Sequence, residues 1–284
     1  MINTYKSYGL EVIPNPFSEH VLTSIKRALQ EEMPFSVIRI GDGESNLLTY
    51  SVYSNTKNLD CYSVKAIIAM QQDSFIVDGN WMIILRDLIV GAVAQANVVG
   101  VIGLWRGGCP TTEEIVKNLS QDYRGSIGHW RAVDYMLSLA GKDYLNKKIV
   151  ASAHLYFSIM EHLNTILPLA KKVFIISNNK SIVEKLRRNY LALNFEYIPV
   201  GNTKISSKTL PDKPIFLSFV FSALPQDMRG CLCLIGAGPW AEIYCTWVKQ
   251  RGGVGIDIGS GCDLLDGKAT HTIHRRVNIE KYFL

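Results

Sequence analysis

The chain has 284 residues, of which 48% are hydrophobic and 19% are charged, and its formal net charge is +5. A chain of this length and apolar content can bury a sizeable core, which argues against a disordered protein. The modest positive charge does not indicate a nucleic-acid partner, and we expect none. Anionic substrates or a membrane surface fit this charge as well.

Segments typical of helices and of strands alternate along the chain. The first helix is predicted over residues 17–32, with Ser18 as its cap, and it leads into the first strand. The predicted strands are 36–40, 98–104, 148–151, 172–177, 195–200, 231–235 and 253–258. Further helices are predicted over 78–96, 111–119, 130–139, 156–163, 181–190 and 240–251, and a helix or turn over 45–53.

This alternation predicts an α/β fold, in which a largely parallel, Rossmann-like sheet has helices on both faces. No internal repeat or proline-rich linker divides the chain. We therefore expect a single domain over residues 1–284, with 201–214 as its longest loop.

The longest apolar region, residues 88–105, does not predict a membrane span. Gln95 and Asn97 interrupt it, and Arg86 and Asp87 precede it. The N-terminus lacks the basic start and apolar run of a secretory signal. We therefore expect a cytoplasmic protein, and contact with the inner face of the membrane stays open.

The six cysteines do not form a pattern typical of disulfides or zinc. Cys231 and Cys233 are two positions apart on a predicted strand, so their side chains point to the same face. No Cys-x-x-Cys pair occurs. Reduced and mostly buried thiols are the simplest interpretation.

The most informative segment is Gly41-Asp42-Gly43-Glu44, because it directly follows an apolar strand. Asp42 and Glu44 supply hard oxygen ligands that can share one Mn²⁺ or Mg²⁺, whose open positions a diphosphate can complete. Arg39 adds a fixed positive charge beside them. The structural alternative stays open, since Asp and Gly are ordinary turn residues and an acidic residue often caps a helix.

A second glycine-rich segment follows the strand predicted over 231–235. Gly236 and Gly238 form the strand-plus-Gly-x-Gly pattern shared by dinucleotide and S-adenosylmethionine sites, with Ala241 in place of the third glycine. Pro239 would give the next helix a short, rigid start, so that phosphate or sugar can approach backbone N–H groups.

Asp257 ends the last predicted strand and is the first candidate for a general base. A carboxylate at a strand end can accept a proton from an acceptor hydroxyl if burial raises its pKa. A buried Asp that only orders the Gly259-Ser260 turn explains the position equally well. Asp263 and Asp266 are expected to cap the final helical turn.

The two glycine-rich segments together resemble the GT-D-type glycosyltransferases of bacteria. In that family an N-terminal strand ends in Arg-x-Gly-Asp-Gly-Glu, and the C-terminal region carries Gly-Pro-x-Ala, a helix and Asp-Ile-Gly. The matching residues here are Arg39 to Glu44, Gly238 to Ala241 and Asp257 to Gly259. The glycine- and asparagine-rich loop expected late in the middle region is replaced by Ile176-Ser177-Asn178-Asn179-Lys180.

The resemblance implies a metal-dependent enzyme, in which Asp42 and Glu44 are the ligands of Mn²⁺ or Mg²⁺. It implies a nucleotide-sugar donor, in the first place a UDP-sugar, and a glycan or glycoprotein acceptor in the synthesis of bacterial surface glycans. From the residues themselves two other classes stay open. One is a Rossmann-type enzyme dependent on a nucleotide or S-adenosylmethionine, and the other is a non-catalytic subunit that binds sugar nucleotides or glycans.

Three further strand ends carry candidate donor-binding residues. Arg106 can pair with phosphate, or it can be a surface arginine beside a core tryptophan. His154 can donate to phosphate, or it can be a structural cap or core histidine. Ser177 and Asn178 are expected to cap the helix that starts at 181, where the same N–H groups could hold an anion. Basic residues and His271 and His274 near the C-terminus are expected on a solvated surface, and contacts to a diphosphate or to anionic lipid are the alternative.

Overall fold

The computed structural model describes residues 2–52, 60, 79–103, 135–136, 138–139, 145, 148–200 and 213–284. The helix predicted over 111–119, most of the helix predicted over 130–139 and most of the predicted loop 201–214 lie outside these residues. The chain divides into two compact units, each built from separate stretches of sequence. Unit 1 comprises residues 1–16 and 38–155, and unit 2 comprises residues 17–37 and 156–284. The single-domain organisation stays a prediction.

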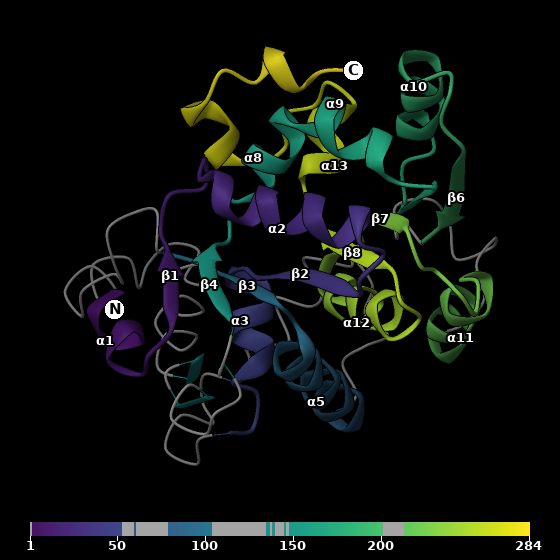
Figure 1. Cartoon of the computed structure of the whole chain (residues 1–284). Coiled ribbons are helices and arrows are strands. Elements are labelled where there is room, and N and C mark those ends of the chain that lie inside the picture. The colour runs from purple at the N-terminus through teal and green to yellow at the C-terminus, as the bar shows by residue number, and fades with distance from the viewer. Residues whose placement is uncertain are drawn as a thin grey trace. The chain divides into compact units, whose positions relative to one another are not determined.

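Unit 1 contains short parallel strands and several helices (Figure 1). Its strands are β1 (Glu11–Ile13), β3 (Val98–Val101), β4 (Ile149–Ser152) and the end of β2 (Phe35–Ile40). Its helices include α1 (Ile2–Ser7), α3 (Asp42–Leu48) and α5 (Gly79–Gln95). β4 pairs with β1 on one side and with β3 on the other, both in parallel.

Unit 2 contains longer strands between two layers of helices. Its strands are the start of β2, β5 (Lys172–Ser177), β6 (Phe195–Pro199), β7 (Cys231–Gly236) and β8 (Val254–Asp257). Its helices are α2 (Glu19–Gln30), α8 (Tyr156–Glu161), α9 (Leu163–Ile166), α10 (Ser181–Asn189), α11 (Lys213–Ala223), α12 (Ala241–Gln250) and α13 (Gly261–Leu265). Short 3₁₀ turns span Leu167–Leu169, Gly238–Trp240, Thr272–Arg276 and Glu280–Tyr282.

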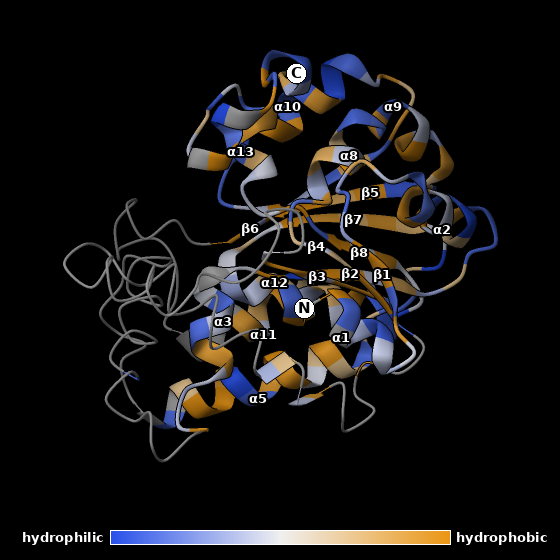
Figure 2. Ribbon diagram, turned by 90° about the vertical axis from the view of Figure 1, so that its left-hand side faces the viewer, coloured by the Kyte–Doolittle hydropathy of each residue, from blue (hydrophilic) through white to orange (hydrophobic). Residues whose placement is uncertain are grey.

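The strand order is β1-β4-β3-β2-β8-β7-β5-β6, and every pairing with a described register is parallel. In unit 2, α2 and α8 lie on one face of the strands and α12 lies on the other (Figure 2). The predicted α/β fold with a parallel sheet and helices on both faces is therefore confirmed. In such sheets ligands bind beyond the carboxyl ends of the strands, where the loops meet.

The strands form the hydrophobic core, as their colour in Figure 2 shows. All four residues of β3 and of β8 are buried. Gly255 of β8 allows α12 to lie directly on the sheet, because a Cβ atom at this position would be 2.9 Å from the Cα and from the carbonyl oxygen of Cys245. This close approach fixes the distance between α12 and β8, and α12 follows directly on the loop after β7.

Several local predictions are confirmed and a few are wrong. Ser18 caps α2 by accepting a hydrogen bond from the backbone N–H of His20. Cys231, Cys233, Cys245 and Cys262 are free cysteines, as expected. The helix predicted to start at 45 starts at Asp42 instead. Within the described part of the chain, no helix is both long and apolar enough to cross a membrane.

Candidate functional site

In unit 1 the predicted carboxylates lie in the first turn of a helix, not in a turn before it. α3 starts at Asp42, directly after the extended residue Gly41. The Glu44 side chain folds back, and its Oε2 accepts a hydrogen bond of 3.1 Å from the Gly41 N–H. Ser45 donates its hydroxyl hydrogen to the Gly41 carbonyl. The Glu44 contact satisfies the Gly41 N–H, one of the backbone groups that a helix start leaves open, and so favours a helix that begins earlier than predicted.

The Glu44 contact confirms the capping alternative for this residue, and it also fixes where the carboxylate lies. An ionised acid in the first turn of a helix is favoured by the backbone dipoles. Gly43 is buried and Gly41 is half-buried, so the polypeptide surrounds this turn closely. Asp and Glu at positions 42 and 44 are the types of oxygen ligand that Mn²⁺ or Mg²⁺ requires, so the residue types at this turn suit such a metal.

No group of three or more His, Cys, Asp or Glu side chains suited to a metal occurs among the described side chains, which do not include that of Asp42. The protein would therefore supply two carboxylates at this turn, and a diphosphate would complete the coordination. Mg²⁺ sites of this kind commonly combine one or two carboxylates with phosphate oxygens and water.

Arg39 lies near the carboxyl end of β2 and reaches toward the end of β4. Its Nη1 donates a hydrogen bond of 3.2 Å to the carbonyl oxygen of Ala153. Gly100 of β3 leaves room for this side chain, since a Cβ atom there would be 3.3 Å from Cγ of Arg39. The backbone N–H of His154 donates to the Ser152 hydroxyl at 3.2 Å, which forms the turn after β4. Unit 1 thus brings Arg39 close to the turn that carries His154.

Gly41→Ala is expected to move the Glu44 carboxylate with little loss of stability. A Cβ atom at position 41 would lie 2.6 Å from Glu44 Oε2, and the backbone there is extended, so only the flexible end of the side chain must shift. The free energy of unfolding should change by less than about 1 kcal/mol. Calorimetry should show weaker Mn²⁺-dependent binding of UDP. Full binding by this variant would contradict a role for the Glu44 carboxylate.

In unit 2 the predicted glycine-rich loop and the predicted base follow neighbouring strands. β7 pairs with β8, and the N–H groups of Ile258 and Gly259 both donate to the carbonyl of Ile235. A Cβ atom at Gly236 would lie 3.0 Å from the carbonyl oxygen of Gly259. The loop after β7 and the turn after β8 therefore touch.

The residues of this loop have the geometry that the sequence predicts. Gly238 has a φ of +55°, in the left-handed region that favours glycine, and a Cβ atom there would meet nothing within 4 Å. Pro239 is buried in the 3₁₀ turn that leads into α12. Asp257 is 3% exposed at the end of β8. Asp257 is thus a buried carboxylate at a strand end, as both its functional and its structural interpretation require.

Glu242 is a buried carboxylate to which no role was assigned from sequence. It lies in the first turn of α12 and is 1% exposed. A buried ionisable group at a helix start beside a glycine loop is a candidate for function. The only sequence signal was an acidic residue directly after Gly238-Pro239-Trp240-Ala241, which is equally typical of an ordinary helix start.

The turn after β5 differs from the prediction. Asn178 is exposed, and Asn179 caps the start of α10 by accepting from the N–H of Ser181 at 3.1 Å. The Ser177 hydroxyl accepts from the Asn179 N–H at 3.0 Å, which turns the Asn179 side chain toward the helix. The capping role expected of Asn178 therefore belongs to Asn179, and a role of Asn178 in donor binding stays a prediction.

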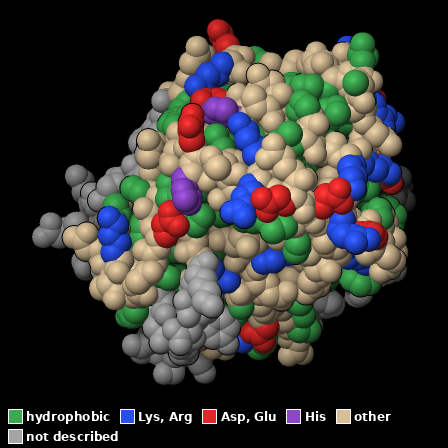
Figure 3. Space-filling model, in the orientation of Figure 1, with side chains coloured by type: hydrophobic (Ala, Val, Ile, Leu, Met, Phe, Trp, Pro, Cys, Tyr) green, Lys and Arg blue, Asp and Glu red, His purple; other side chains and the backbone are tan. Residues whose placement is uncertain are grey.

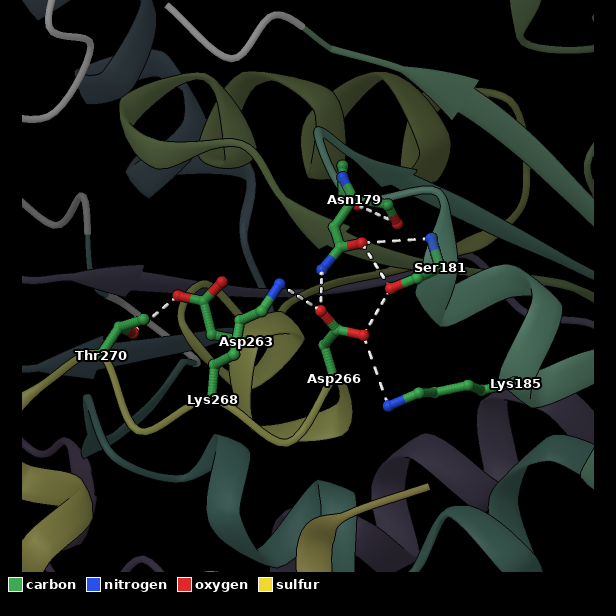
Figure 4. A network of polar contacts seen from close by, with 8 residues as sticks. Asn179, Ser181, Lys185, Asp263, Asp266, Lys268 and Thr270 are labelled. Atoms are coloured by element: carbon green, nitrogen blue, oxygen red, sulfur yellow. Dashed lines mark hydrogen bonds and ion pairs between the residues drawn. The ribbon is translucent and has the colours of Figure 1, made fainter. Parts of the chain in front are cut away.

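A carboxylate of the protein itself lies at the start of α10. Figure 4 shows Asp266 surrounded by donors from two segments. Its oxygens accept from Asn179 Nδ2 at 2.9 Å and from the Ser181 hydroxyl, and they pair with Lys185 Nζ at 3.3 Å and Lys268 Nζ at 2.5 Å. Asp266 is the C-cap of α13, as expected, and its side chain in addition joins the start of α10 to the segment after α13.

Two of the C-terminal basic residues, Lys268 and Lys281, form ion pairs with acidic partners. Lys281 pairs with Glu161, whose Oε1 also accepts a hydrogen bond of 2.6 Å from the Tyr282 hydroxyl. On the face drawn in Figure 3, Lys and Arg side chains lie interspersed with Asp and Glu side chains. The predicted solvated surface is wrong for His274, which is 0% exposed. Arg106 lies outside the described residues.

A protein-family model described as a GT-D fold-like domain matches residues 17–210, which is more than half of the chain. The match includes β2 and the Asp42 and Glu44 turn, and it ends before β7. No curated protein and no solved structure matches the chain.

Proposed function

The chain belongs to the GT-D fold-like family, and on this basis we propose that it is a metal-dependent glycosyltransferase that uses a nucleotide-sugar donor, most simply a UDP-sugar. The observation that supports the proposal best is the turn after β2, where Asp42 and Glu44 share the first turn of α3 and Glu44 is held by the Gly41 N–H. The acceptor would be a glycan or glycoprotein in bacterial surface glycan synthesis, at the cytoplasmic side of the membrane.

In this proposal the carboxylates of Asp42 and Glu44 bind Mn²⁺ or Mg²⁺. When bound, the cation would offset the charge that develops on the leaving nucleoside diphosphate. Arg39 contributes positive charge from β2, and its hydrogen bond to Ala153 restricts the orientation of the guanidinium group. A guanidinium group with a fixed orientation loses less entropy when it pairs with phosphate.

The unit 2 residues have a separate role in the proposal. The backbone at Gly238 is open to close approach by a sugar or phosphate, whereas Gly236 lies against Gly259 and Cys262. Asp257 accepts the proton of the acceptor hydroxyl. The place of Asp257 at the carboxyl end of β8, where ligands of parallel sheets bind, supports this role. His154, Asn178 and Arg106 remain candidate donor contacts.

The test is a calorimetric and thermal-shift panel of UDP, GDP, CMP, NAD and S-adenosylmethionine, each with and without Mn²⁺. We expect UDP with Mn²⁺ to stabilise the wild-type chain, by about 2.7 kcal/mol at a hundredfold excess over Kd. The effect should disappear in Asp42→Asn. It should also disappear in Glu44→Gln, which retains an oxygen to accept the Gly41 N–H and so keeps the helix start.

Two controls separate loss of the metal site from loss of the fold. Asp87→Asn removes an exposed carboxylate that pairs with the adjacent Arg86, and it should bind UDP as the wild type does. Glu44→Ala removes the hydrogen bond to Gly41 as well as the charge and should cost about 1 kcal/mol more than Glu44→Gln. Stabilisation by NAD or S-adenosylmethionine that depends neither on Mn²⁺ nor on Asp42 would favour a Rossmann-type enzyme and overturn the proposal. Binding without any donor hydrolysis would favour a non-catalytic subunit.

A further inference from the structure

Ser260 and the buried His274 form a pair beside the glycine-rich loop of unit 2. Ser260 lies three residues after Asp257, in the turn after β8, and its side chain is half-buried. His274 comes from the 3₁₀ turn near the C-terminus and is 0% exposed. The Ser260 Oγ and the His274 Nε2 are 3.4 Å apart.

The contacts of His274 fix the orientation of its ring and determine which ring nitrogen carries the proton. The rings of Tyr156 and Phe157 meet the imidazole edge-on, with centroid distances of 6.4 Å and 6.1 Å. The backbone N–H of His271 donates to His274 Nδ1 at 3.4 Å. A ring nitrogen that accepts a hydrogen bond carries no proton, so the proton of the neutral ring lies on Nε2. Nε2 therefore donates to the Ser260 hydroxyl.

The hydrogen bond from His274 Nε2 determines which further hydrogen bonds the Ser260 hydroxyl can make. A serine hydroxyl has one donor and two acceptor positions, and the imidazole uses one acceptor position. The hydroxyl hydrogen then points away from the ring. The turn that carries Ser260 touches the loop after β7, since a Cβ atom at Gly236 would meet the Gly259 carbonyl oxygen at 3.0 Å. Ser260 is thus a hydrogen-bond donor with a fixed orientation at two adjoining strand ends.

We infer that the Ser260 hydroxyl donates to a phosphate oxygen of a diphosphate ligand bound at the ends of β7 and β8, and that His274 is the positioning residue that orients this hydroxyl. The inference rests on the proposed function, which supplies a diphosphate as the class of ligand. A hydroxyl suits this position because it can contact phosphate without adding charge, and Gly238 in the adjoining loop leaves its backbone open to a ligand. The pair itself is neutral.

The probes are UDP and inorganic pyrophosphate, each titrated calorimetrically with Mn²⁺ into the full-length chain. Ser260→Ala is expected to weaken binding of both probes about tenfold, the usual loss for a hydrogen bond to a charged group. Ser260→Thr, which keeps the hydroxyl, should restore most of the affinity. Ser24→Ala is the matched control, because this hydroxyl lies on the surface helix α2 and donates to the His20 carbonyl.

A double-mutant cycle with His274→Phe separates positioning from a structural role. If His274 acts through Ser260, His274→Phe weakens binding in the wild type and has no further effect in Ser260→Ala. Additive losses in the double variant would overturn the positioning role. Because His274→Phe can affect folding, the thermal midpoint of each variant is measured, and Ser260→Thr provides an independent test in a chain that keeps the imidazole.

The outcomes distinguish this inference from the proposed function. UDP binding that is equal in wild type and Ser260→Ala overturns the inference and leaves the proposed glycosyltransferase intact. Binding of pyrophosphate but not UDP, lost in Ser260→Ala, supports the inference and overturns the nucleotide donor. A wild-type chain that binds neither probe overturns both.

Discussion

Asp266→Asn is expected to lower the free energy of unfolding at pH 7 by about 3 kcal/mol, as is typical when one partner of a buried ion pair is removed. The side chain is 8% exposed, and the substitution keeps its shape while removing its charge. Lys185, itself only 23% exposed, would lose its carboxylate partner. Chemical denaturation of the two proteins measures the difference.

The pH dependence of this loss follows from the pKa of Asp266. Burial alone would raise this pKa, but hydrogen bonds from the surrounding donors outweigh burial and hold the pKa well below its usual range. The donors are Lys268, Ser181, Asn179 and Lys185. Since the folded-state pKa lies below the unfolded value of about 3.9, the stabilisation is complete above about pH 5 and is lost as the pH falls toward the folded-state pKa.

The difference in stability between wild type and Asp266→Asn should therefore be constant from pH 7 to about pH 5 and then shrink. Asp263→Asn is the matched control, because the Asp263 carboxylate accepts from the Thr270 hydroxyl at 2.7 Å in the same short segment (Figure 4). Its loss should be no more than about 1 kcal/mol. Equal losses of unfolding free energy in the two variants would show that the donors around Asp266 stabilise the fold no more than the single hydrogen bond of Asp263 does.

Gly255→Ala is expected to destabilise the protein by about 3 kcal/mol, although it adds a single methyl group. The new Cβ atom would lie 2.9 Å from two backbone atoms of Cys245 and 3.2 Å from Cβ of Val248. Backbone atoms cannot rotate away as a side chain can, so α12 would have to move off β8. Denaturant titration measures the loss, and the same displacement should weaken UDP binding because α12 follows the Gly236 loop.

Gly91→Ala is the control for this prediction. Gly91 lies within α5, and a Cβ atom there would meet nothing within 4 Å. Alanine favours a helix over glycine by up to about 1 kcal/mol, so this variant should be as stable as wild type or more stable. If both substitutions had the same small effect, the close contact between α12 and β8 would not be a constraint on the fold.

The fold could be predicted where the local pattern determines the element. β5 was predicted with both of its ends, because its apolar run is bounded by polar residues on each side. β1 was missed because three residues are too few to show a strand pattern. α11 was missed because its sequence, KPIFLSFVFSA, is apolar on nearly all sides and shows no helical periodicity.

The candidate site could be predicted only in part, for a similar physical reason. The glycines and carboxylates of the two loops are adjacent in sequence, so their grouping was visible. Two of the partners of Asp266, Ser181 and Asn179, are 85 and 87 positions away along the chain, and no local pattern indicates such contacts. His274 looked like part of a charged surface because its neighbours are basic, but its ring packs against Tyr156 and Phe157.

The pairing of β2 with β8 has a consequence for how the chain folds during synthesis. Phe35 and Val37 lie opposite Val254 and Ile256, so the first half of this strand has no partner on that side until most of the polypeptide has left the ribosome. Contacts this distant in sequence slow folding and leave apolar strand edges exposed in the nascent chain. Chains truncated before β8 should therefore bind chaperones and aggregate, even though they contain every residue that the family model matches.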